Sequence, residues 1–70
     1  MNAEIVQKLN EIQTECNKAY ERHGLALQAF QVACARHDWM LAQKEQDEAL
    51  TNLNAYMDGL QAIRRLQQTL

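Results

Sequence analysis

Apolar side chains recur through the first half of the chain at steps of three or four residues, from Ile5 to Leu41. Such spacing places them on one face of a continuous α-helix, because an α-helix makes one turn every 3.6 residues. The members of this first apolar stripe are Ile5, Leu9, Ile12, Cys16, Tyr20, His23, Leu27, Phe30, Cys34, His37 and Leu41. Charged residues fall between them and predict a solvated outer face.

A second stripe with the same spacing predicts another helix in the second half. It follows a polar segment, residues 43–48, that offers no apolar anchor. Its members are Ala49, Leu50, Leu53, Tyr56, Met57, Leu60, Ile63, Leu66 and Leu70. The aromatic and methionine side chains on both stripes are predicted to fill the core. With no proline and only two glycines in 70 residues, the composition favours an all-α fold.

The segment between the two stripes carries helix-ending and helix-starting signals. Arg36 and His37 suit the carboxyl end of a helix, and Asp38 suits the N-cap of the next. Asn2 can cap the first helix in the same way. The sequence therefore predicts two helices of nearly equal length, about 3–36 and 39–69, folded as an antiparallel hairpin that makes residues 1–70 a single domain.

Gly24 leaves a second topology open. A glycine can end a helix, and a reversal near this residue would bring Cys16 opposite Cys34. The stripe keeps its phase across Gly24, however, which favours a helix-interior glycine where another backbone comes close. If the chain instead reverses near His37, the two thiols lie 18 residues apart on one helix, about 27 Å, and cannot form a disulfide.

Charge and length exclude several classes of function. The net charge is −2 and the longest basic run is Arg64-Arg65, whereas nucleic-acid binders need a basic stripe to neutralise phosphates. No apolar run approaches the length of a membrane span. The charge and the short apolar runs therefore predict neither nucleic-acid nor membrane partners. The first residues do not resemble a signal peptide, so we expect a cytoplasmic protein. A domain of this size is also marginal alone, which favours assembly into a four-helix or coiled-coil-like oligomer.

Potential metal ligands and catalytic groups do not form a signature. Cys16, His23, Cys34 and His37 share one face, but their spacing matches no zinc pattern, which needs paired ligands close together. Along a straight helix these four cannot converge. A hairpin also lacks the pocket that a catalytic pair needs. We therefore expect no metal, no cofactor and no enzymatic activity.

A further group of apolar residues lies off the main stripe. Leu25, Val32 and Trp39 recur every seven residues, and Met40 adds to them near the turn. Residues 25–41 are thus apolar nearly all round, which is typical of a helix buried on more than one side. A two-helix hairpin covers only one side. These four residues are the predicted partner-binding face, and the alternative is that surface positions simply tolerate them.

The predicted function follows from this architecture. In length, long arms and a polar turn just past the middle, the chain resembles the two-helix co-chaperones of bacterial type III secretion needle proteins; the resemblance includes no specific motif and carries over no residue. We expect a chaperone, adaptor or inhibitor type of module that masks an apolar or helical surface of a partner protein. We expect the partner to be a second copy of the chain, which would give a homodimer, or a helical protein of different sequence, or both. The alternatives are a purely structural coiled-coil oligomerisation element and a small phage- or plasmid-type regulator of a host protein.

Overall fold

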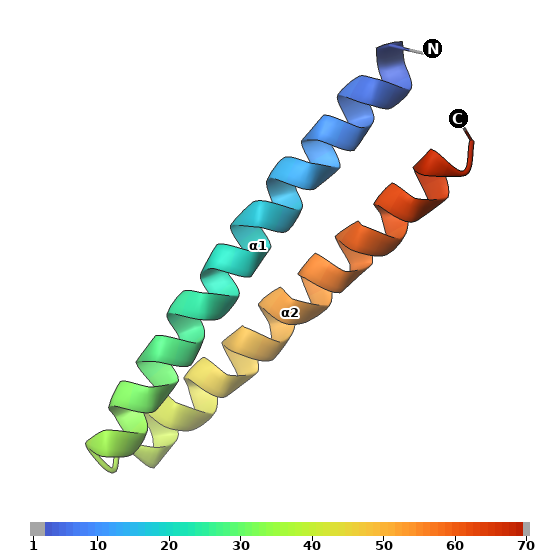
Figure 1. Ribbon diagram of the computed structural model, residues 1–70. Helices are drawn as coiled ribbons and strands as arrows, with labels where there is room; N and C mark the ends of the chain where they lie inside the picture. The colour runs from blue at the N-terminus through green and yellow to red at the C-terminus, as the bar shows by residue number, and fades with distance from the viewer. Residues whose placement is uncertain (1–2, 70) are drawn as a thin grey trace.

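The computed structural model describes residues 3–69 and contains two long helices joined by a short turn (Figure 1). Helix α1 spans Ala3–Ala35 and helix α2 spans Trp39–Gln67. They run antiparallel, so the start of α1 and the end of α2 lie at the same end of a rod measuring 54 × 14 × 11 Å (Figure 1). The all-α hairpin is confirmed, with each helix ending one or two residues before its predicted limit. The predicted cap Asn2 and the stripe residue Leu70 lie outside the described residues.

The turn is built around His37, whose φ of 58° is in the left-handed region. The His37 N–H donates to the Cys34 carbonyl at 3.1 Å, and the Asp38 N–H donates to the Ala33 carbonyl at 2.9 Å. This pair of bonds is a Schellman motif, which satisfies carbonyls at the end of a helix and usually places glycine at the left-handed position. The reversal near His37 is therefore confirmed, and the alternative reversal at Gly24 is wrong.

Asp38 begins the second helix, as predicted. Its carboxylate accepts a hydrogen bond from the Leu41 N–H at 3.2 Å, and its carbonyl accepts the first helical bond, from the Ala42 N–H at 2.9 Å. A side-chain oxygen at this position satisfies a backbone donor that has no partner within the helix. The end of one helix and the start of the next are thus encoded within three residues.

The interface between the helices is lined by unusually small side chains. The buried apolar residues of the described chain are one cysteine and five alanines, namely Cys16, Ala19, Ala26, Ala33, Ala42 and Ala49. Within each helix the alanines recur every seven residues. That heptad spacing keeps two helices in contact along their length, because it matches 3.5 rather than 3.6 residues per turn.

The contact line differs from the predicted apolar stripes beyond Cys16. The stripe continued through Tyr20, Leu27 and Leu41, but these side chains are exposed, whereas the neighbouring Ala19 and Ala26 are buried. The prediction followed the larger side chains at the helical period. The two helices instead stay in contact along the heptad positions, so the stripe drifts out of the interface.

Glycine allows a close approach of the two helices at Gly59. A β-carbon there would collide with the Cys16 thiol, so α2 can press against α1 only because position 59 has no side chain. Gly24 is helix-interior, as predicted, but the expected close backbone is absent: among the described residues, no atom beyond its chain neighbours and its own helix backbone lies within 4 Å of the place its β-carbon would take. The close approach occurs at the other glycine.

Candidate protein-binding surface

The four predicted partner-binding residues are all exposed. The exposed fraction is 65% for Leu25, 49% for Val32, 63% for Trp39 and 87% for Met40. Leu25 and Val32 lie in the last third of α1, and Trp39 and Met40 form the start of α2. We call these four residues the turn-end group. The hairpin leaves all of them available to a partner.

The structure does not align this group as a single row. The seven-residue recurrence that joined Trp39 to Leu25 and Val32 assumed a continuous helix, yet α1 ends at Ala35. Trp39 therefore belongs to α2, where its indole meets the imidazole of His37 edge-on with ring centres 5.6 Å apart. The turn-end group consists of two pairs on separate helices.

Leu25 faces a charged neighbourhood. It lines a shallow surface hollow together with Arg22 of α1 and with Glu45 and Glu48 of α2. An apolar side chain bordered by charges of both signs is typical of the rim of an interface, where the surrounding groups remain in water.

A second exposed apolar group was missed as a surface because the sequence placed its members inside the core. We call it the apolar flank, and it consists of Tyr20 and Leu27 of α1 with Leu50, Met57 and Leu60 of α2. In each helix these residues directly follow an interface position of the heptad, which places them on one side of the contact line. The rings of Tyr20 and Tyr56 join the two helices there, with centres 5.3 Å apart.

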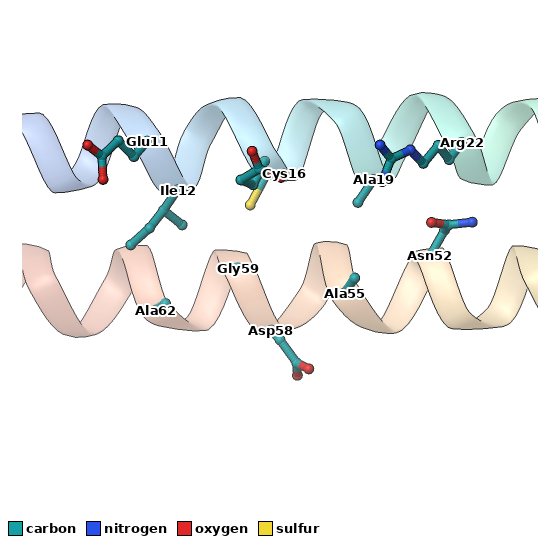
Figure 2. Close-up of a pocket in the computed structure, with 11 residues that line it drawn as sticks. Glu11, Ile12, Cys16, Ala19, Arg22, Asn52, Ala55, Asp58, Gly59 and Ala62 are labelled. Atoms are coloured by element: carbon teal, nitrogen blue, oxygen red, sulfur yellow. The ribbon is translucent and has the colours of Figure 1, made fainter.

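The opposite side of the hairpin carries a groove of about 550 Å³ (Figure 2). Its floor is made by Cys16, Ala19 and Gly59, and its borders include Glu11, Glu15, Arg22 and Asp58. Figure 2 shows the Cys16 sulfur directed toward α2 and the Asp58 carboxylate directed away from α1. The charged groups thus border the groove without converging on a common point in it.

Polar groups between the helices bind backbone carbonyls. The Nδ1–H of His23 donates to the Ala49 carbonyl at 2.9 Å, because a carbonyl oxygen can only accept. The Cys16 thiol donates to the Tyr56 carbonyl with a sulfur–oxygen distance of 3.8 Å. These bonds fix the register of the helices, and they occupy two of the four residues considered above as metal ligands.

The other two candidate ligands lie farther along the same arm. Cys34 is in the last turn of α1 and His37 is in the connecting turn. Both cysteines are free thiols, and within residues 3–69 no three His, Cys, Asp or Glu side chains are grouped closely enough to hold a metal ion. Neither described helix contains an apolar stretch long enough to cross a bilayer.

Comparison of the chain with known protein families, curated proteins and solved structures finds no match in any of the three. The fold and its surface define an all-α helical hairpin with two exposed apolar groups, the turn-end group and the apolar flank. The function is therefore argued from these surfaces.

Proposed function

We propose that this chain is a non-enzymatic protein-binding module, of chaperone, adaptor or inhibitor type, that masks an apolar or helical surface of a partner protein. The observation that supports it most directly is the exposure of the turn-end group, above all the 63% exposure of Trp39. Tryptophan is among the residues most enriched in the energetic centres of interfaces. An indole left in water at the tip of a narrow rod is available to insert into an apolar groove.

The shape of the molecule supports the same function. Leu25 and Val32 on one helix and Trp39 and Met40 on the other present apolar anchors from two directions at the turn. The Schellman turn and the Asp38 cap hold the last turn of α1 and the first turn of α2 in fixed positions. A partner therefore meets a largely preorganised surface, which reduces the entropy lost on binding.

The experiment is a capture from the native cell with the tagged chain, identification of the bound protein by mass spectrometry, and titration of that purified protein. Trp39→Ala should weaken its binding about tenfold or more, which corresponds to ~1.4 kcal/mol. Leu41→Ala is the matched control, since Leu41 is an exposed apolar residue of the same helix that belongs to neither the turn-end group nor the apolar flank. Equal affinities for the two variants would refute the assignment of Trp39 as an anchor.

The alternative function is a structural coiled-coil oligomerisation element. The heptad spacing of the buried alanines favours it, because this spacing is typical of helices that associate along their length. Sedimentation over a concentration series distinguishes the two functions. A self-sufficient oligomer that captures no other protein supports the structural element, and a chain that captures a client through Trp39 supports the binding module. A phage- or plasmid-type regulator of a host protein would act by the same masking mechanism.

A further inference from the structure

The isolated hairpin exposes more surface than a compact protein of its mass. Its accessible area is 5526 Å² for a chain of 8.1 kDa, whereas a compact monomer of that mass exposes about 4,500 Å². The excess is therefore about 1,000 Å², and a standard protein–protein interface buries about 800 Å² on each partner. One further chain of the same size can cover the difference.

The apolar flank is a candidate surface for that cover. Its five residues are 42% to 59% exposed, and the Tyr20–Tyr56 ring pair lies at its centre. The buried positions between the helices are mostly alanine, and the five larger side chains of the flank lie outside the hairpin's own interface. An assembly that buries the flank would supply the apolar burial that the alanine contact line lacks.

Few charged residues lie on this side of the molecule, and Glu21 borders the hollow at Tyr20 and Tyr56. On α1, the positions that directly follow a heptad interface position, from Val6 to Cys34, carry only apolar residues, glycine, asparagine and glutamine. On α2, Arg64 is the one charged residue among the corresponding positions, which begin with Gln43 and end with Gln67. Depletion of charged residues at the centre of a patch is characteristic of protein interfaces. The rest of the charge lies on the other positions of the two helices.

The position of the flank suits a two-fold axis. Cys16 packs against Gly59, and in that antiparallel register Leu60 and Leu27 mark the two ends of the flank, on either side of the middle of the rod. A second copy that is rotated by 180° about an axis through that middle lies with its own flank against the flank of the first copy. A self-complementary patch of this kind is the requirement for a closed homodimer.

We propose that a second copy of this chain packs on the apolar flank, so that two hairpins form a four-helix homodimer. The inference deepens the proposed binding function by naming one partner, and it rests on a surface separate from the turn-end group. The dimer leaves Trp39 and Met40 at both tips for another protein. A protein of different sequence on the flank is the competing outcome of the test.

The test compares two leucines that are two residues apart in α1. Leu27 belongs to the flank and Leu25 does not, and both are exposed. Sedimentation of the full chain over a wide dilution series should give twice the chain mass for the wild type. Leu27→Glu should raise the dimer dissociation constant about tenfold or more, while Leu25→Glu leaves it unchanged. A wild type that stays monomeric throughout, or equal effects of the two variants, would overturn the proposal.

A second pair of substitutions, with uncharged replacements, controls for loss of folding. Met57→Gln alters the flank and Met40→Gln alters the turn-end group, with the same uncharged replacement in the same helix. Only Met57→Gln should weaken the dimer, and circular dichroism should show equal helix content in both. The reverse result, with Met40→Gln weakening the dimer, would also overturn the flank assignment. Capture of a client protein by the Leu27→Glu variant separates the two proposals. If the variant loses the dimer but still captures the client, both proposals are supported. If the wild type forms the dimer but captures no client, only the proposed binding function is contradicted.

Discussion

The Cys16 sulfur in α1 occupies the space that a β-carbon on Gly59 in α2 would need. The β-carbon of Cys16 itself would lie at an ordinary contact distance, 3.8 Å from that position. The collision therefore involves the thiol alone. Since Cys16 is only 2% exposed and its sulfur contacts the Tyr56 carbonyl, the sulfur has little room to move aside.

Gly59→Ala should consequently destabilise the hairpin, although alanine is the better helix former by about 1 kcal/mol. Overpacking of a close contact costs about 1–3 kcal/mol, which exceeds the gain in helix propensity. Gly24→Ala is the matched control, because the position of its β-carbon is open and only the propensity gain remains. Urea unfolding measures both, and a Gly59→Ala chain as stable as Gly24→Ala would show that the helices are farther apart than described.

Removal of the sulfur should reverse the effect. In a Cys16→Ala background the collision disappears, so Gly59→Ala should become neutral or stabilising. The two substitutions are then coupled, with an interaction free energy that a double-mutant cycle of urea unfolding measures. Additive effects would mean that some other contact limits the approach at Gly59.

The hairpin could be predicted from the sequence because its signals are local and consistent. The in-phase apolar positions, the absence of proline, and the sequence Arg36-His37-Asp38 all indicate two long helices with a reversal near the middle. Each signal acts within one helix or one turn. The helix ends and the Asp38 cap therefore follow from neighbouring residues without knowledge of the packing.

The contact line could not be predicted in the same way. A hydrophobic pattern gives most weight to large side chains, so Tyr20 and Leu27 were assigned to the interior in place of Ala19 and Ala26. Which of two adjacent apolar positions faces the other helix depends on how closely the helices approach, and that depends on Gly59 at the far end of the chain. The apolar flank was missed for the same reason, since its residues had been placed in the core.

The left-handed backbone at His37 supplies another prediction. A side chain with a β-carbon pays about 1–2 kcal/mol to adopt this conformation, and glycine does not. His37→Gly should therefore stabilise the hairpin by about 0.5–1 kcal/mol after the loss of the ring contact with Trp39. His37→Val should destabilise it, because a β-branched residue is still less tolerant of positive φ. Thermal unfolding checks both, and a stabilising valine would contradict the observed turn.

The two thiols should react at very different rates with an exposed-thiol reagent. Cys16 is 2% exposed, whereas Cys34 is only half-buried. Cys34 should be modified first, and Cys16 only when the helices separate, so that urea accelerates its reaction. A Cys34→Ala chain isolates the slow phase. Equal rates in the wild-type chain would show that α1 and α2 do not hold Cys16 between them.

The alanines of the contact line should resist enlargement. Ala26 is 5% exposed, and the register set by Cys16 and Gly59 places it opposite the equally small Ala49. Ala26→Leu adds apolar surface but forces the helices apart, so it should cost about 1–3 kcal/mol in the free energy of unfolding. Ala55→Leu, the same change at an exposed position of α2, should alter it by less than about 0.5 kcal/mol. A stabilising Ala26→Leu would mean that the helices meet along the larger side chains, with Leu27 inside, and both the heptad contact line and the apolar flank would then be wrong.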